Sequence, residues 1–123
     1  MSKKSKNKIN IKFCGGNSWD VTGSMTYIET PNRKILLECG LWQSTGSTLE
    51  NWKINSRRLD FKPNKLDYVF SCDRHVDHIG LIPRLYSSGA TCPIIAPRGS
   101  KPIAEILMRD SARIIAGDAA SLS

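Results

Sequence analysis

A short polar stretch between two apolar segments constrains the fold of this chain more than any other feature. Residues 66–70 form an apolar, β-branched and aromatic run that is typical of a buried strand. Farther on, Ile79, Ile82, Leu85 and Tyr86 recur at helical spacing. The stretch between them is therefore predicted to turn from a strand into a helix. In open α/β sheets such a turn lies at the carboxyl ends of the strands, where the sheet leaves a crevice for ligands.

The same stretch carries both histidines of the protein, with two aspartates beside them. Its candidate metal ligands are Asp73, His75, Asp77 and His78. Imidazole nitrogen and carboxylate oxygen are good ligands for zinc, so four such groups on one turn predict a metal site. The plainer interpretation is a solvated polar turn in which an aspartate caps the following helix. The residues alone leave both interpretations open.

Composition places the chain among small intracellular proteins. It has 123 residues, 40% of them hydrophobic, which suits one small domain or part of a larger one. No apolar run approaches the ~18 residues of a membrane helix, and no apolar segment of a secretion signal follows the Lys-rich start. The four cysteines are widely spaced, which favours free thiols in a reducing cytoplasm. Cys39 and Cys72 each follow an apolar strand and are expected to be buried.

The formal charge of +7 is distributed unevenly along the chain. Five lysines precede the first acidic residue, Asp20. Residues 1–8 are predicted to be a disordered basic tail and residues 9–123 the folded domain. The tail could contact the phosphates of a nucleic acid, or it could simply be a solubilising arm.

The remaining pattern predicts an α/β fold, a β-meander followed by β-α-β-α. A half-buried strand is expected at 9–13, followed by strands at 25–30 and 34–39 with a hairpin turn between them. A weaker pattern suggests a short helix beginning near residues 46–48, and Trp42 and Trp52 are expected to pack against the core. A helix at 79–87 precedes a short buried strand at 93–96. A last helix, with Ser100 as its N-cap, should face the sheet through Ile103, Ile106, Leu107, Ile114 and Ile115.

Several segments resemble one known family. His75-Val76-Asp77-His78-Ile79-Gly80 is similar to the second half of the H-x-H-x-D-H-x-G signature of metallo-β-lactamase fold hydrolases. Further segments are similar, in the same order, to the β-CASP branch of that superfamily, whose members process RNA and DNA. They are Asp20-Val21-Thr22-Gly23-Ser24, Ile35-Leu36-Leu37-Glu38-Cys39-Gly40, the strand at 66–70, residues 79–86, and Ala104-Glu105-Ile106-Leu107 with Asp110-Ser111-Ala112.

The resemblance implies the N-terminal half of a four-layer αββα sandwich. One sheet with helices on a single face would leave its other face uncovered, so a missing C-terminal half or an oligomeric partner is expected. The family's site holds two zinc ions. By resemblance, Asp73 and His75 would face the first ion, and Asp77 and His78 the second. Asp77 would also orient the attacking water, and Glu38 would hold a ligand in place by a hydrogen bond.

Two departures from the family pattern fall at this site. Asp73 stands where the signature has its first histidine, and Glu38 stands where the family has an aspartate. In addition, the chain contains no histidine after His78, although family members draw further ligands from later motifs. We therefore expect this chain to be incomplete for catalysis.

Two classes of function remain open at this stage. The first is a zinc-dependent hydrolase that cuts nucleic-acid phosphodiester bonds in its full-length form, with RNA favoured over DNA. The second is a non-catalytic relative or fragment that keeps the scaffold as a binding module. A small-molecule hydrolase on the same fold is disfavoured by the matches around Thr22-Gly23-Ser24 and Asp110-Ser111-Ala112.

Overall fold

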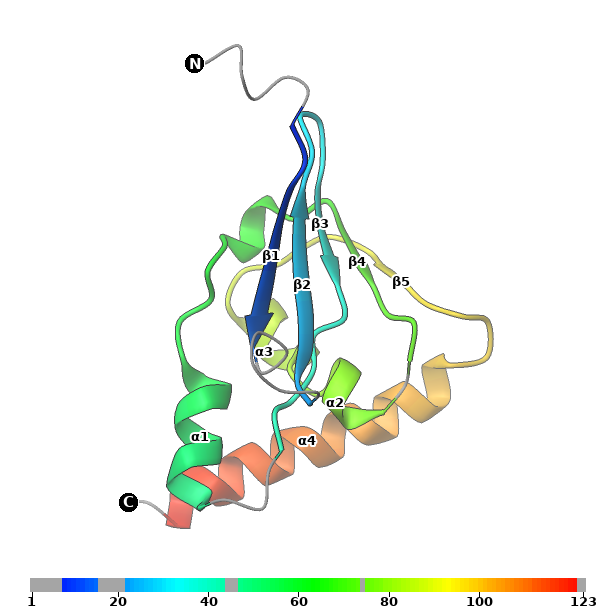
Figure 1. Cartoon of the computed structure of the whole chain (residues 1–123). Coiled ribbons are helices and arrows are strands. Elements are labelled where there is room, and N and C mark those ends of the chain that lie inside the picture. Colours follow the sequence, from blue (N-terminus) through cyan, green and yellow to red (C-terminus); the bar gives the residue numbers. More distant parts are fainter. Residues whose placement is uncertain (1–7, 16–21, 44–46, 74, 122–123) are drawn as a thin grey trace.

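In the part of the chain that the structure describes, five strands form one mixed sheet, and the longest helix runs beneath it (Figure 1). The computed structural model describes residues 8–15, 22–43, 47–73 and 75–121. Its elements are β1 (Asn10–Gly15), β2 (Ser24–Glu29), β3 (Lys34–Leu37), α1 (Thr48–Ser56), the 3-10 turn η3 (Pro63–Lys65), β4 (Tyr68–Phe70), α2 (Val76–Ile79), α3 (Ile82–Ser87), β5 (Ile94–Ile95) and α4 (Lys101–Ser121). The predicted α/β class, a meander followed by β-α-β-α, is confirmed.

The sheet changes from antiparallel to parallel at its centre. Its order is β1-β2-β3-β4-β5, with β1, β2 and β3 antiparallel and β4 and β5 parallel to β3. The predicted hairpin between β2 and β3 is present, because Thr30 Oγ1 accepts a hydrogen bond from Arg33 N at 2.9 Å. Asp67 Oδ2 accepts one from Lys34 N at 2.8 Å and so joins the starts of β3 and β4. As a result, β3 and β4 also end side by side.

Only one face of the sheet is well covered. Leu36 and Val69, at the centre of that face, are fully buried. On the other face Ile11 and Phe13 of β1 are 56% and 64% exposed, so the expectation of a half-buried first strand is wrong. No element in the described part of the chain packs over these two side chains, and alternation by itself cannot show whether a partner layer is present. The predicted uncovered face is therefore found at β1.

The helix expected at 79–87 is divided into two. α2 ends at Ile79 and α3 begins at Ile82, with Gly80 and Leu81 in a turn between them. Pro83 lies in the first turn of α3, a position where its missing N–H removes no hydrogen bond. The carbonyl of Gly80 accepts a hydrogen bond from the buried Ser111 hydroxyl of α4 at 2.7 Å. The helical spacing of apolar residues predicted one helix because α2 and α3 both pack against the same core, so the spacing continues across the turn between them.

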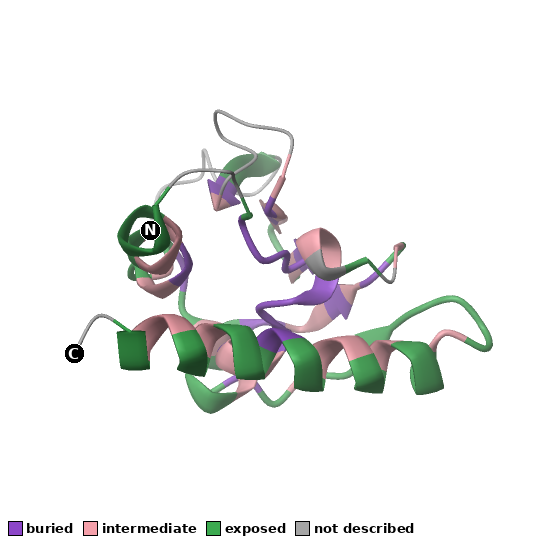
Figure 2. Cartoon of the chain, turned by 90° about the horizontal axis from the view of Figure 1, so that it is seen from below, coloured by how far each residue is buried: buried purple, intermediate pink, exposed green. Residues whose placement is uncertain are grey.

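In the second half of the chain, several apolar residues that the sequence pattern predicts to be buried are exposed. β5 lies at the sheet edge, and Ile94 and Ile95 are 41% and 43% exposed, so the prediction of a buried strand is wrong. In α4, the expected stripe is wrong at three of its four isoleucines. Ile103, Ile106 and Ile114 are exposed, and Figure 2 shows exposed residues along much of α4. Leu107 and Ile115 pack against the core as expected. Ala104, Met108 and the buried Ser111 complete the packed stripe.

Several smaller expectations have definite outcomes. Helix α1 begins after Ser47, whose hydroxyl accepts a hydrogen bond from Glu50 N, and Trp42 is buried. Cys39 is buried as expected, but Cys72 is exposed because the chain leaves the sheet there. The predicted disorder of residues 1–7 and the segment around Asp20 lie outside the described residues. Within the described residues, no helix is long and apolar enough to cross a membrane.

Candidate metal centre

The candidate residues gather where β3 and β4 end. Glu38 directly follows β3, and its backbone N–H donates to Phe70 O at 2.8 Å. The Glu38 carboxylate then accepts a hydrogen bond from Cys72 N at 2.6 Å. The two chain segments are therefore held together just beyond the sheet. This is the edge at which parallel α/β sheets place their binding crevices.

Glu38 occupies an unusual backbone conformation for its residue type. Its φ is +63°, and among the described residues it is the only non-glycine with positive φ. Left-handed backbone costs a residue with a side chain about 1 kcal/mol or more and persists only where surrounding contacts require it. Here the required contact is the carboxylate, which is 12% exposed and turned toward the 72–78 loop.

The loop that carries His78 is fixed against the residues that follow Glu38. Cys39 N donates to His78 O, and Leu81 N donates to Cys39 O, each at 2.8 Å. Gly40 lies so close that a Cβ at this position would be 1.7 Å from Asp77 O. These contacts set the position of the Asp77–His78 backbone relative to the sheet.

His78 lies among three carboxylates. Its Nδ1 is 3.5 Å from Glu38 Oε2, and its Nε2 is 3.7 Å from Asp77 Oδ2 and 3.9 Å from Asp73 Oδ2. Both His78 Nδ1 and Glu38 Oε2 are buried and form no hydrogen bond within the described structure. Buried polar atoms of this kind normally have a partner, so this pair is the most unusual polar feature of the site.

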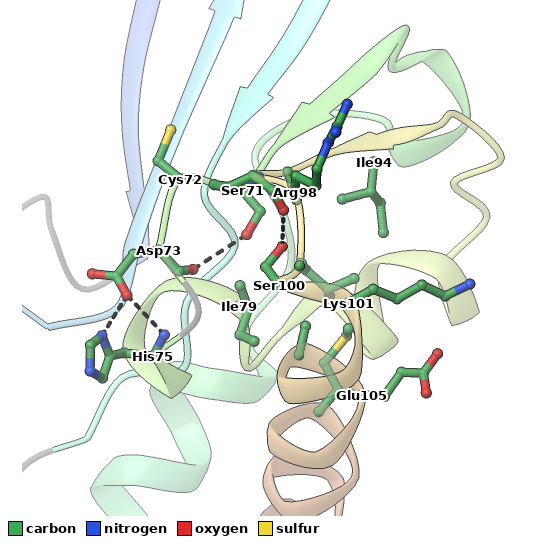
Figure 3. Close-up of a pocket in the computed structure, with 16 residues that line it drawn as sticks. Ser71, Cys72, Asp73, His75, Ile79, Ile94, Arg98, Ser100, Lys101 and Glu105 are labelled. Carbon is green, nitrogen blue, oxygen red and sulfur yellow. Dashed lines mark hydrogen bonds and ion pairs between the residues drawn. The ribbon is translucent and has the colours of Figure 1, made fainter.

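Asp73 and His75 form a separate pair at the end of the loop (Figure 3). Asp73 Oδ1 lies 2.5 Å from His75 Nδ1 and accepts a hydrogen bond from His75 N at 3.0 Å. These donors, first the backbone N–H and then the ring, hold the pKa of the Asp73 carboxyl below its usual range. The His75 side chain is 75% exposed, so this pair faces solvent rather than a closed centre.

The histidine and aspartate side chains of this loop are of the types that bind zinc, but too few of them converge to form a complete zinc site. Two ligands at about 2.1 Å from a tetrahedral ion lie about 3.4 Å apart, close to the separation of His78 from Asp77. However, the described residues contain no group of three or more His, Cys, Asp or Glu side chains that could hold a metal ion. A closed zinc site needs three or four protein ligands. As arranged, the described residues offer pairs of ligands and no complete site.

A cavity of about 740 Å³ opens beside this loop (Figure 3). One side consists of Ser71, Cys72, Asp73 and His75, and the other consists of the segment from Ile94 into the first two turns of α4. Arg98, Lys101 and Glu105 supply charges on the α4 side. The sequence interpretation assigned no role to these three residues, because a segment 20 or more residues beyond the histidines carries no pattern that links it to the loop. Only the fold brings them together.

The structure therefore supports part of the sequence interpretation of the site. Asp73, Asp77 and Glu38 all lie within 4 Å of His78, whereas His75 contacts Asp73 and is 75% exposed. Their roles as metal ligands, and the role of Asp77 in orienting a water, stay predictions. Gly40 was missed as a positioning residue, although the glycine directly after an apolar strand is a signal of close backbone approach.

Comparison with known proteins is consistent with this geometry. The family model described as the metallo-beta-lactamase superfamily matches residues 19–116. A ribonuclease from Thermus thermophilus is 29% identical over 81% of this chain and 22% of its own length. A probable RNase from Methanocaldococcus jannaschii is 32% identical over 80% of this chain and 22% of its own length. The transcription termination factor FttA from the same organism is 28% identical over 83% of this chain and 16% of its own length. The chain thus spans about a fifth of the length of these relatives.

Proposed function

Because this chain belongs to the metallo-beta-lactamase superfamily, we propose that it forms part of a metal-dependent hydrolase that cuts phosphodiester bonds of nucleic acid, RNA in preference to DNA. The observation that carries the proposal is the position of the His78 cluster beside a cavity, at the carboxyl ends of two parallel strands. The relatives named as a ribonuclease and a probable RNase support RNA as the substrate and the β-CASP branch as the subfamily. A cytoplasmic location suits such a substrate.

We assign the loop the role of a partial zinc site. Asp77 and His78 would supply ligands on one side, and Asp73 and His75 on the other, while Glu38 positions the loop by its hydrogen bond to Cys72 N. The remaining ligands would have to come from residues beyond those described. Within the described residues, these pairs by themselves support no hydrolytic step, and the incompleteness of the chain for catalysis stays a prediction.

To test the proposed function, the part of the Thermus thermophilus ribonuclease that aligns with this chain is replaced by this chain. We expect the chimera to cut single-stranded RNA when zinc or manganese is added, and His78→Ala and Asp77→Ala to abolish cutting. The isolated chain, and its Asp73→His variant, should show no appreciable activity. A folded chimera that binds RNA without cutting it would refute the hydrolase.

One observation favours the alternative, a non-catalytic binding module. Both contacts from His75 end on Asp73 Oδ1, so this carboxylate has only Oδ2 left to face an ion. If that arrangement persists in the full-length protein, the first zinc position is weakened. Asp73→His in the chimera distinguishes the two functions, because it should raise the cutting rate of a weakened enzyme and leave a binding module inactive.

A further inference from the structure

We propose that the cavity beside the His78 loop binds a segment of single-stranded nucleic acid, with Arg98 and Lys101 in contact with its phosphates. This inference rests on the proposed function, because it assigns a substrate surface to the same site. It adds two residues that neither the sequence pattern nor the family signature singles out.

The cavity has the size of a nucleotide site. Its volume of about 740 Å³ falls within the range of about 300–1,000 Å³ typical of small-ligand pockets. The stacked and paired bases of a duplex cannot enter a space of this size, whereas the unstacked bases of a single strand can. The dimensions therefore favour a single strand with one or two nucleotides inserted.

The floor of the cavity is apolar. Ile79 and Ile82 from the core side and Ile94, Ala104 and Met108 from β5 and α4 line it. Such a surface has no charge to repel a base and can take either a purine or a pyrimidine. The described lining contains no Phe, Tyr or Trp, and its one aromatic ring, the His75 imidazole, lies at the loop end of the cavity, so we expect a base on the apolar floor to be held by enclosure rather than by stacking.

The two basic side chains, Arg98 and Lys101, lie on the α4 side of the cavity. Arg98 and Lys101 are both exposed, and within the described part of the chain neither forms an ion pair with a carboxylate. In Figure 3 they flank Ile94, with Asp73 and His75 at the opposite end of the opening. A strand whose phosphate contacts Arg98 or Lys101 would thus extend across the floor toward the His78 loop. Arg and Lys are the residues that commonly hold phosphates in this way.

Two carboxylates at the cavity oppose an anionic ligand. Asp73 lies at the loop end, and Glu105 lies one helical turn from Lys101. The proposal therefore makes an unusual prediction for Glu105. Removal of its charge should strengthen binding, whereas removal of either cation should weaken it.

The test is fluorescence anisotropy of a short labelled single strand, as RNA and as DNA, with the full chain and EDTA present. We expect Arg98→Gln and Lys101→Gln to raise Kd about threefold to fivefold each. Each lost phosphate contact should also reduce the log–log salt slope by about 0.7. Glu105→Gln should lower Kd. The charge-matched controls Arg33→Gln and Lys53→Gln lie outside the cavity lining and should leave Kd almost unchanged.

A second measurement locates the ligand independently of charge. Cys72 is exposed and belongs to the residues at the cavity, whereas Cys92 does not. A bound single strand should slow maleimide alkylation of Cys72 and leave that of Cys92 unaffected. Filling the cavity with Ala96→Phe should weaken binding, whereas Ala116→Phe, on an exposed part of α4, should not.

The proposal is overturned if the cation variants bind no more weakly than the two controls, if a duplex competes as well as the single strand, or if Cys72 is not protected. Circular dichroism melting of each variant separates loss of binding from loss of fold. Since EDTA removes any metal-dependent cutting, these results do not depend on activity. If the chimera is inactive but a bound single strand still protects its Cys72 from alkylation, only the proposed hydrolase function is refuted. If the chimera is active but Cys72 is not protected, only the proposed binding in this cavity is refuted.

Discussion

Gly40 lies in direct contact with the backbone of Asp77, so closely that a Cβ on Gly40 would be 1.7 Å from Asp77 O and 2.9 Å from His78 N. A residue that follows β3 therefore determines where the histidine loop after β4 can lie. Backbone atoms cannot move aside as a flexible side chain can, so no larger residue fits without displacement of the loop.

Gly40→Ala should destabilise the protein by about 1–3 kcal/mol, the usual cost of forcing extra volume into a packed region. Chemical denaturation measures this. The matched control is Gly117→Ala in α4, where an added Cβ meets nothing within 4 Å. That change should stabilise the helix by about 0.5–1 kcal/mol. Equal effects of the two substitutions would show that the contact at Gly40 is not a constraint.

Glu38 is held at φ +63° by the contacts of its carboxylate. Two substitutions at this position can separate the cost of the backbone strain from the contribution of the hydrogen bond to Cys72 N. Glu38→Ala keeps the left-handed strain and removes the acceptor of Cys72 N, so it should cost about 1–3 kcal/mol. Glu38→Gly removes the same acceptor and also relieves the strain. We expect the Gly variant to be more stable than the Ala variant by about 1 kcal/mol. The opposite order in urea unfolding would show that the backbone at this position is not strained.

Zinc binding by the isolated chain should be weak, because the described ligands occur in pairs and not in sets of three or four. Equilibrium dialysis should find no tight stoichiometric binding, and Asp73→His should change this little. His78→Ala should remove most of the weak binding that remains, since His78 has the most carboxylates around it. Tight binding of two ions by the unmodified chain would contradict the partial site.

The cysteines should differ sharply in reactivity in the native state. Cys72 is exposed, whereas Cys14 and Cys39 are 3% and 1% exposed. Burial also holds the pKa of the Cys39 thiol above its usual range, so that little thiolate is present. Mass spectrometry after brief alkylation should find Cys72 modified first and Cys39 last. Cys72→Ser should remove the fast phase and leave the slow phases unaltered.

The uncovered face at β1 should promote association of the chain in solution. Ile11→Thr with Phe13→Thr should reduce dye binding and self-association in analytical ultracentrifugation, with a small effect on stability because both side chains are exposed. Leu36→Thr, at a fully buried position on the opposite face, should instead destabilise by several kcal/mol, about 2–5 for a core change of this kind. A stable, monomeric parent chain would show that the β1 face does not mediate association.

The sequence by itself determined the order of the elements and the location of the site loop. Local patterns were sufficient for this, because alternation, helical spacing, a hairpin turn and a polar cluster after an apolar run each act over a few residues. They identified β2, β3, β4 and α4, and they placed Asp73, Asp77 and His78 at the end of β4.

Burial and the surroundings of the site were decided only by the tertiary structure. Ile11, Ile95 and Ile106 have the apolar character of core residues, yet they are exposed, because burial depends on which other element covers a face. The close approach of Gly40 to Asp77, and the cavity that Arg98 and Lys101 share with the loop, join segments distant in sequence. Such contacts arise from the packing of β3, β4 and α4 together, and no local spacing encodes them.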